Sequence, residues 1–294
     1  MITSTVNISE TENIELEALV NCVYQLSGYD FREYASASVY RTVMKEVERN
    51  KLKYIAELIP LIIHDPDKLE QLLQNLSINV TEFFRDPKLY RLLVDTIFPV
   101  LSSYPFIKIW HAGCANGKEP YSMAILLDEY GLLDKTLIYA TDFNHKVLAQ
   151  GKKGVYPRSE IDNLTEQYYR AGGKHSLERY FYSQYDSSQV SKRIKSRITF
   201  AHHNLVSDGV FGEVQLIVCK NVMIYFNSDL KQRVLQLFTD SLCPHGFLCL
   251  GTTESINGHN RHQNYACLPG TMNIFKKTGQ QPSKEPPMER VSLL

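Results

Sequence analysis

The most informative stretch of the chain is FIKIWHAGCANGKEPYSMAILLDEYG (106–131). FIKIW (106–110) predicts a β-strand, and EPYSMAILLDEYG (119–131) predicts a helix that ends at a glycine. The turn between them contains Gly113 and Gly117, and glycine lets a ligand approach the backbone closely. Because ligands of open α/β sheets bind at the carboxyl ends of the strands, this turn is a candidate binding site. Taken alone it is equally consistent with a structural turn, and its Gly-x-x-x-Gly spacing disfavours a dinucleotide-binding dehydrogenase.

The chain after this stretch continues to alternate between strands and helices. The predicted strands are TLIYATD (136–142), ITFAHHNL (198–205), VQLIVCKN (214–221) and GFLCLGTT (246–253), and the predicted helices are HKVLAQGKKG (145–154) and LKQRVLQLFTDSL (230–242). We therefore expect an α/β fold with a parallel-rich sheet and helices on its faces. Residues 157–197 fit this alternation badly because they are polar and tyrosine-rich, and they predict an insertion or a subdomain.

The first part of the chain has a different, helical pattern. Ser9 and Glu12 have capping-box spacing, and the helix that they start is expected to end at Gly28. A second helix is expected over 35–50, and Asp65 followed by Pro66 predicts the start of another. The expected domains are a helical one at 9–78 and an α/β one at 79–276 with the insertion near 157–197. A polar, proline-containing tail at 277–294 is expected to be disordered.

Composition excludes several classes of protein. The 32 basic and 32 acidic residues balance, which disfavours nucleic acid as the main partner. No run of about 18 apolar residues predicts a membrane span, and the polar N-terminus does not resemble a signal peptide. The six cysteines form no C-x-x-C pair, so we expect reduced thiols in a cytoplasmic protein. The pairs His202–His203 and His259-x-x-His262 have no acid or cysteine that completes a ligand set, so no metal site is expected.

Two acids strengthen the interpretation of the glycine turn as a binding site. Glu119 begins the helix after the turn, and Asp142 ends the next strand, 29 residues after Gly113. An acid at the end of a second strand can accept hydrogen bonds from ribose hydroxyls. Each acid alone has a simpler explanation, as a favourable charge at a helix N-terminus or as an N-cap. Together with the glycine turn, they predict a cradle for a nucleoside.

Two further segments carry polar and aromatic residues at predicted junctions. NVTEFFRD (79–86) joins the helical part to the sheet, either as an interdomain packing seam or as a lid over a ligand. CKNVMIYF (219–226) places Lys220 and Asn221 at the end of a strand, followed by Tyr225. A strand end with core aromatics would explain the second segment equally well.

Taken in order, these stretches resemble the chemotaxis receptor methyltransferases of the CheR type. The matching stretches are NVTEFFRD (79–86), IWHAGCANGKEPYS (109–122), YATDFN (139–144), HNL (203–205), CKNVMIYF (219–226) and LGTTES (250–255), within roughly residues 15–275. The resemblance implies a Rossmann-like S-adenosylmethionine-dependent methyltransferase domain preceded by a small all-helical domain. GYDFREY (28–34) and AGGKHS (171–176) resemble a branch of the family often found near receptor-independent signalling proteins.

The resemblance also implies roles for individual residues. Arg85 and Tyr225 match the pair placed beside the methyl donor and proposed to act in catalysis. With the glycine turn included, the expected contacts of S-adenosylmethionine, and of its product S-adenosylhomocysteine, are Asn79, Thr81, Arg85, Gly113, Glu119, Asp142, Asn204, Leu205, Lys220 and Asn221.

The implied reaction is methyl transfer to glutamate side chains of a chemoreceptor cytoplasmic domain or a related signalling protein. A glutamate has an unperturbed pKa of about 4.3, so it is ionised at neutral pH and needs no general base. Arg85 can pair with this carboxylate bidentately. The expected partners therefore include no nucleic acid, and no insertion into a membrane is expected. A non-enzymatic module that binds S-adenosylmethionine and a small-molecule methyltransferase stay as alternatives.

The chain departs from the family pattern in several places. Lys118 stands where the family often has an acid, and Lys220 stands where arginine is common. The helix expected at 35–50 is often strongly basic in the family, but here it is near neutral, with Arg41, Lys45, Glu46, Glu48 and Arg49. The insertion at 157–197 occupies the place where some members carry a small β subdomain that tethers receptor tails. Glu119 is intact behind Lys118 and Lys220 keeps the positive charge, so function is expected to survive these two changes, whereas the near-neutral helix leaves the acceptor protein open.

Overall fold

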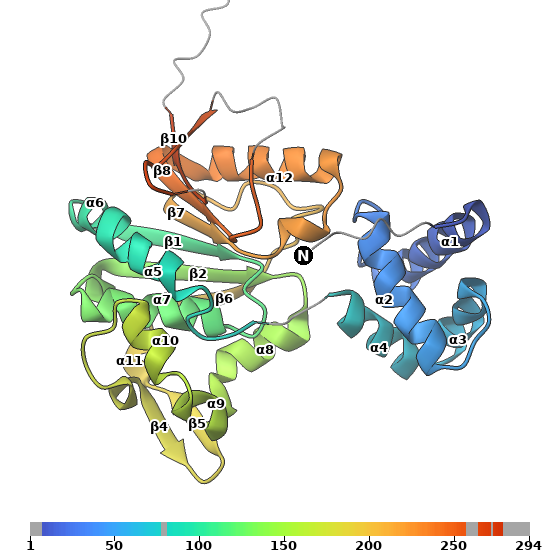
Figure 1. Cartoon of the computed structure of the whole chain (residues 1–294), viewed down its shortest axis with the longest axis horizontal. Helices are drawn as coiled ribbons and strands as arrows, with labels where there is room; N and C mark the ends of the chain where they lie inside the picture. Colours follow the sequence, from blue (N-terminus) through green and yellow to red (C-terminus); the bar gives the residue numbers. More distant parts are fainter. Residues whose placement is uncertain (1–7, 78–80, 257–263, 272, 279–294) are drawn as a thin grey trace, which may run out of the picture.

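A computed structural model describes residues 8–77, 81–256, 264–271 and 273–278. Figure 1 shows a group of helices from the first part of the chain beside a larger α/β part that contains the central sheet. Within the described residues, none of the helices has the length and the apolar composition needed to cross a membrane.

The helical part has its own hydrophobic core. Its helices are α1 (Glu10–Ser27), α2 (Ser36–Arg49), α3 (Leu58–His64) and α4 (Pro66–Leu76). The capping box of Ser9 and Glu12 is confirmed, and Gly28 ends α1 with φ +74°. The Asp65 side chain caps α4 with Pro66 in its first turn, as predicted. Apolar side chains from α1, α2, α3 and α4 pack together, among them Leu19, Val43, Ile62 and Leu72.

The α/β part is built on a sheet of seven strands in the order β6-β2-β1-β7-β8-β10-β9. The strands are β1 (Ile107–Ala112), β2 (Thr136–Asp142), β6 (Ile198–His202), β7 (Val214–Cys219), β8 (Leu242–Leu250), β9 (Tyr265–Cys267) and β10 (Ile274–Lys277). The first five strands in this order are parallel, and β10 and β9 are antiparallel. The five parallel strands were all predicted, whereas β9 and β10 were not. β10 extends one residue into the stretch predicted as a tail, and residues 279–294 lie outside the described part.

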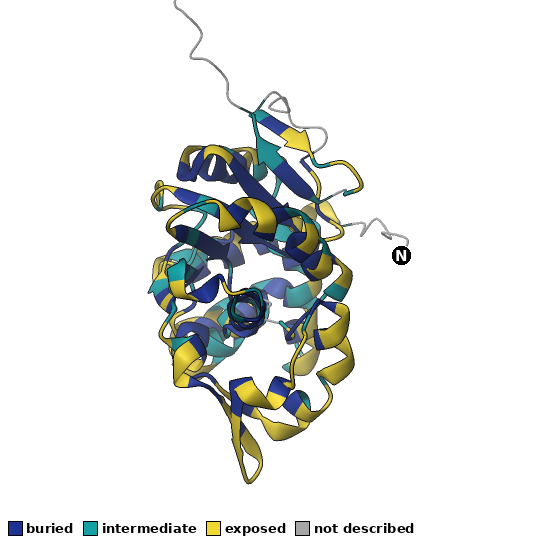
Figure 2. Cartoon of the chain, turned by 90° about the vertical axis from the view of Figure 1, so that its left-hand side faces the viewer, coloured by how far each residue is buried: buried dark blue, intermediate teal, exposed yellow. Residues whose placement is uncertain are grey.

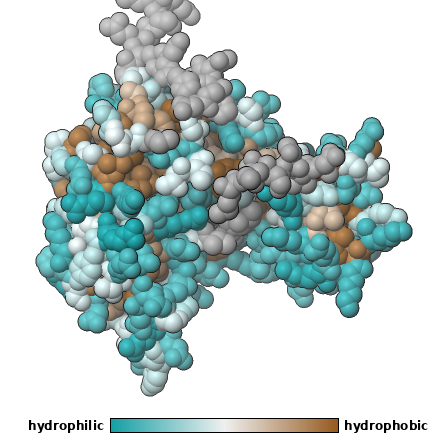
Figure 3. Space-filling model, in the orientation of Figure 1, coloured by the Kyte–Doolittle hydropathy of each residue, from teal (hydrophilic) through white to brown (hydrophobic). Residues whose placement is uncertain are grey.

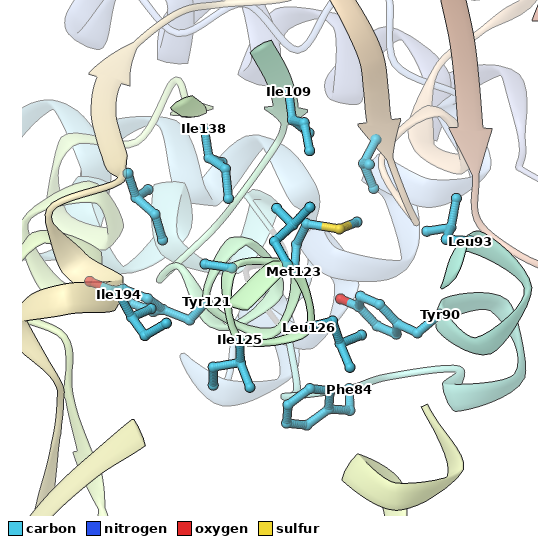
Figure 4. Packing of buried hydrophobic residues seen from close by; sticks show 14 of the residues in the cluster. Phe84, Tyr90, Leu93, Ile109, Tyr121, Met123, Ile125, Leu126, Ile138 and Ile194 are labelled. Atoms are coloured by element: carbon cyan, nitrogen blue, oxygen red, sulfur yellow. The ribbon is translucent and has the colours of Figure 1, made fainter. Parts of the chain in front are cut away.

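Helices cover both faces of the sheet and bury it. α5 (Pro87–Leu92), α6 (Phe98–Ser102), α7 (Lys118–Glu129) and α8 (His145–Lys153) lie on one face, and α12 (Ser228–Ser241) lies on the other. Figure 4 shows the core of the first face, where side chains of α7 such as Met123 and Leu126 point toward Ile109 and Tyr90. Buried residues accordingly concentrate in the sheet and in α7 (Figure 2). This burial holds the carboxyl ends of the parallel strands in fixed register.

The insertion predicted near 157–197 forms a small subdomain. Its elements are β3 (Val155–Pro157), α9 (Arg158–Asp162), α10 (Thr165–Arg170), β4 (Phe181–Gln184), β5 (Ser187–Val190) and α11 (Lys192–Lys195), with the strands in the antiparallel order β3-β5-β4. The buried carboxylate of Glu129 in α7 accepts hydrogen bonds from the hydroxyls of Tyr168 and Tyr180 and contacts His175 Nδ1 at 2.6 Å. The tyrosines that made this region look irregular thus anchor it to α7. The β4–β5 hairpin projects away from the sheet and is mostly hydrophilic (Figure 3).

Candidate functional site

One pocket at the carboxyl ends of the parallel strands contains the predicted site. Its lining includes ten of the predicted residues: Thr81, Arg85, Gly113, Glu119, Asp142, Asn204, Leu205, Lys220, Asn221 and Tyr225. Asn79 lies outside the described residues. Residues separated by more than a hundred positions meet here because β1, β2, β6 and β7 are parallel neighbours whose carboxyl ends lie at one edge. The roles of the individual residues stay predictions.

The glycine turn after β1 is held against the end of β2. The backbone N–H groups of Gly113 and Cys114 both donate to the carbonyl of Thr141, at 2.8 and 2.9 Å. Gly113 has φ +76°, and a Cβ on it would lie 2.5 Å from a methyl carbon of Val222. Only glycine satisfies both conditions. The turn therefore presents bare backbone to the pocket.

Asp142 at the end of β2 is fixed by the same turn. Its carboxylate accepts the N–H of Ala115 at 2.9 Å and the N–H of Asn144 at 3.0 Å. Burial raises the pKa of Asp142, and these backbone N–H groups oppose the rise. The side chain is thus oriented at the edge of the pocket with part of its acceptor capacity still open.

Glu119 is held between two basic groups. His111 Nδ1 lies 3.0 Å from Glu119 Oε1, and Lys220 Nζ lies 3.4 Å from Glu119 Oε2. Burial acts to raise the pKa of Glu119, but the charge of Lys220 and the hydrogen bond with His111 outweigh it, so the pKa is lowered. Glu119 is therefore an ionised carboxylate with a fixed orientation. Lys220 also donates to the carbonyl oxygen of Arg85 at 2.9 Å, so it ties the segment after α4 to the end of β7.

His111 and Glu254 are residues of the site that the sequence reasoning missed. His111 follows Ile109 by two positions in β1, and this alternation was the available signal that its side chain faces α7 and Glu119. The carboxylate of Glu254 accepts the backbone N–H groups of Asn221, Val222 and Ile224, at 2.8, 3.0 and 3.3 Å.

Glu254 accepts a fourth backbone N–H, from Gly251 at 2.8 Å. It thereby holds the loop that contains Tyr225, in which Asn221 has φ +60°. Burial raises the pKa of Glu254, and the four N–H groups oppose the rise. Its position in the LGTTES stretch (250–255), directly after the predicted strand at 246–253, was the available signal in the sequence, and that signal did not indicate the contact.

Arg85 and Tyr225, the predicted catalytic pair, both line the pocket. Burial raises the pKa of Tyr225, and the positive charges of Arg85 and of Arg41 in α2 act against the rise. The phenol of Tyr225 is therefore neutral at pH 7 and can donate a hydrogen bond. The pocket thus places a cation and a hydroxyl donor beside each other.

The histidine pairs have contacts of their own. The ring of His202 stacks on that of His145 with centroids 4.5 Å apart, and His203 Nε2 lies 3.0 Å from the carbonyl oxygen of Gly209. His259 and His262 lie outside the described residues. Packing accounts for His202, and a backbone contact accounts for His203.

Two family models match most of the chain. The all-alpha domain of the CheR methyltransferases matches residues 14–77, and their SAM-binding domain matches residues 79–272. The chain belongs to the CheR methyltransferase family. Its cofactor is therefore S-adenosylmethionine, and the protein is a methyltransferase.

Two curated relatives of this CheR family member each match 90% of the chain. Cher3 of Pseudomonas putida is 40% identical over 266 residues, which cover 90% of this chain and 97% of Cher3. The chemotaxis protein methyltransferase of Borreliella burgdorferi is 30% identical and covers 90% of this chain and 95% of its own. Chemotaxis protein methyltransferase 1 of Vibrio cholerae is 31% identical, with coverage of 78% and 85%. Among solved structures, PKMT2 of Rickettsia typhi aligns over 58% of this chain and 26% of its own, at 15% identity and a TM-score of 0.35.

The residues present fit the cofactor of the family. A nucleoside with an amino-acid tail needs close backbone approach, an acceptor for its ribose and an anionic group near its cationic end. The bare backbone at Gly113, the carboxylate of Asp142 and the carboxylate of Glu119 supply these three features in one pocket.

The family departures have structural explanations. Lys118 does not line the cofactor pocket in the described residues, because its Nζ pairs with Glu160 of α9 at 2.7 Å. Lys220 keeps its charge beside Glu119. In α2, Glu46 is buried and pairs with Arg49 at 2.6 Å, and the exposed charged residues of the helix are Arg41, Lys45, Glu48 and Arg49. The expected charge balance of the surface therefore changes only by the burial of Glu46.

Proposed function

We propose that this protein methylates glutamate side chains of a chemoreceptor cytoplasmic domain, or of a related signalling protein, in the cytoplasm. The observation that carries the proposal is the presence of Arg85 and Tyr225 in the pocket that also contains Glu119 and Asp142. Bound S-adenosylmethionine supplies a methyl group already activated by its sulfonium. The chain's own residues then need only to bind, align and shield the acceptor.

Arg85 suits a carboxylate acceptor. A guanidinium pairs with a carboxylate through two parallel hydrogen bonds, and this pairing fixes the orientation of the attacking oxygen. The neutral phenol of Tyr225 donates one further hydrogen bond without adding a charge. Alignment of this kind is worth roughly 7–11 kcal/mol in favourable cases. A carboxylate acceptor is already ionised, so the proposal requires no general base.

The face of the helical domain beside the pocket suits an acidic partner. Arg41 and Lys45 are exposed on successive turns of α2, with the exposed Glu48 one turn after Lys45, and the charge of Arg41 acts on Tyr225 in the pocket. A protein surface that carries several glutamates would be attracted to this face, and the attraction would weaken with salt. Two of the relatives described above are named chemotaxis protein methyltransferases, which supports a receptor as the acceptor.

The test is methyl transfer to the cytoplasmic domains of chemoreceptors from the same organism. The purified protein is incubated with each domain and labelled S-adenosylmethionine, and the product is treated with mild alkali. We expect base-labile label on the receptor and, by mass spectrometry, a methyl ester on a glutamate. Label that resists alkali, or label only in small molecules, would contradict the proposal.

The Arg85→Ala variant tests the assigned role within this reaction. We expect turnover to fall at least a hundredfold while S-adenosylhomocysteine still binds, because alignment of the acceptor is lost. Arg91→Ala is the matched control, since Arg91 is a half-exposed arginine on α5 that pairs with Asp95. Unchanged turnover in Arg85→Ala would exclude a catalytic role for this arginine.

A further inference from the structure

A short segment of the helical domain lies against the methyltransferase site. We define the docking segment as residues 28–35, which connect α1 to α2. The N–H of Ala35 donates to the carbonyl oxygen of Tyr225 at 2.8 Å, and Tyr34 forms an isolated β-bridge with Phe226. The docking segment is thus bonded to the loop that carries the predicted catalytic tyrosine.

Further contacts attach the docking segment on the same side. The carbonyl of Glu33 accepts the N–H of Asn227 at 3.0 Å, and the carboxylate of Glu33 pairs with the guanidinium of Arg233 in α12. An ion pair between half-exposed groups contributes little by itself. Combined with the backbone bonds, it fixes the position of the segment over the pocket.

The other end of the docking segment packs beside Asp142. The ring of Phe143, the next residue in the chain, lies 5.3 Å from the ring of Tyr29 and 6.1 Å from that of Phe31, edge to face in both cases. Such pairs are worth about 0.5–1.5 kcal/mol beyond the area that they bury. The docking segment therefore spans the pocket from the Tyr225 side to the Asp142 side.

Tyr34 is the residue of the docking segment that lines the pocket. Its ring is held edge to face between Phe31 and Phe226, with centroids 5.1 and 5.2 Å away. In the described part of the chain, no hydrogen bond involves its hydroxyl, although a tyrosine hydroxyl held in a pocket normally finds a partner. Burial raises the pKa of Tyr34, and the negative charge of Asp142 raises it further, so the phenol is a neutral donor near that carboxylate.

Asp142 can accept hydrogen bonds from a ribose but, as a carboxylate, can donate none. A carboxylate has about four acceptor sites, and the backbone N–H groups of Ala115 and Asn144 already use two of them. The remaining sites can accept from the two vicinal hydroxyls of a ribose. Each hydroxyl oxygen can also accept a hydrogen bond, and such a bond needs a donor on the same side of the pocket.

We infer that Tyr34 is a cofactor-binding residue supplied by the helical domain, and that its phenol donates a hydrogen bond to a ribose hydroxyl of S-adenosylmethionine beside Asp142. The assignment rests on the cofactor of the family and does not depend on the acceptor. It also means that the nucleoside is held between the two domains, because the tyrosine and the aspartate belong to different ones.

The test removes the phenol oxygen and the ribose hydroxyls in turn. Calorimetry compares the unaltered protein with Tyr34→Phe for S-adenosylhomocysteine and for its 2′-deoxy and 3′-deoxy forms. We expect Tyr34→Phe to weaken binding of S-adenosylhomocysteine about three- to tenfold, the usual net effect of one hydrogen bond. For the deoxy form that lacks the contacted hydroxyl, the two proteins should bind equally. Tyr54→Phe, at a half-exposed tyrosine of the helical domain, is the matched control and should bind all three ligands like the unaltered protein.

Three results would overturn the inference. Equal binding of all three ligands by Tyr34→Phe and by the unaltered protein would exclude a contact through the hydroxyl. An equal loss for all three ligands would mean that the hydroxyl acts on the pocket and not on the ribose. A loss of the same size in Tyr54→Phe would mean that the effect is not specific to the pocket. Because no acceptor is present, these outcomes are independent of whether the acceptor is a glutamate.

Discussion

Glu254 gives the sharpest test of how the site is held together. The change Glu254→Gln keeps the shape of the side chain but replaces one acceptor oxygen by an NH₂ group. One carboxylate oxygen accepts the N–H groups of Asn221 and Gly251, and the other accepts those of Val222 and Ile224. Whichever way the amide turns, two backbone N–H groups then face a donor and lose their acceptor.

The magnitude follows from these two lost bonds. Leaving a buried N–H unsatisfied costs about 1–3 kcal/mol, so two cost about 2–6 kcal/mol. Glu254 is only 6% exposed, and burial raises its pKa. Burying the charged carboxylate therefore costs the native protein some free energy, a cost that the neutral amide does not have. Because the amide variant avoids this desolvation cost, the expected loss in the free energy of unfolding falls to about 2–4 kcal/mol. The melting temperature should fall by roughly 5–10 °C for a chain of this size.

The assays are urea unfolding followed by circular dichroism and calorimetric titration with S-adenosylhomocysteine. We expect the affinity to fall severalfold, because Asn221 lines the pocket and the loop that Glu254 holds loses its fixed backbone. Glu213→Gln is the matched control, since Glu213 is exposed before β7. If Glu254→Gln unfolds within about 0.5 kcal/mol of the unaltered protein, the carboxylate does not hold the loop and the reasoning is refuted.

Three further predictions concern the pocket. Affinity for S-adenosylhomocysteine should fall as the pH is lowered toward the pKa of Asp142, which burial raises above its ordinary 3.8, because the carboxylate then protonates. Calorimetry should find the Asp142→Asn variant weak and nearly independent of pH, and parallel profiles of the two proteins would contradict this. Gly113→Ala should lower the free energy of unfolding by about 1–3 kcal/mol, because its Cβ would meet Val222 at 2.5 Å with φ +76°, and Val222→Ala in the same chain should restore part of the loss in urea unfolding. Lys220→Met should raise the pKa of Glu119 and so weaken binding of S-adenosylhomocysteine more at pH 6 than at pH 8. Lys220→Arg should keep the dependence of affinity on pH that the unaltered protein has. The same pH dependence in Lys220→Met would show that the lysine does not control the pKa of Glu119.

Much of the fold follows from local patterns. The apolar runs of β1, β2, β6, β7 and β8 and the caps of α1 and α4 depend on residues close in the chain, so periodicity and capping spacing predict them. The two antiparallel strands at the edge were missed because β9 is only three residues long and β10 only four, too short for a period to show. The insertion was recognised as different but not as a sheet, because its order depends on Tyr168, Tyr180 and His175 meeting Glu129 of α7.

The residues of the candidate site also divide into those that local patterns predict and those that they do not. Glu119, Asp142 and Lys220 stand at ends of predicted strands and helices, and parallel strands bring such ends together wherever they lie in the chain. The local sequence was therefore enough to predict that these three residues line one pocket. His111 and Glu254 also follow predicted strands, but their partners Glu119 and the loop after β7 could not be read from that position. Tyr34 has no such position, and its role depends on which surfaces pack.

Physically, this difference reflects the range of the interactions. Hydrogen bonds within strands and helices connect residues at fixed spacings, which a sequence displays directly. The contacts of Tyr34 with Phe226 and of Glu254 with the loop after β7 arise only after the helical domain and the end of the sheet have packed. The sequence thus specified the family, the parallel strands of the sheet and the acids that line the pocket. Tertiary packing alone decided which side chains close that pocket and hold its loops, because those partners are separated by long stretches of chain with no periodic relation.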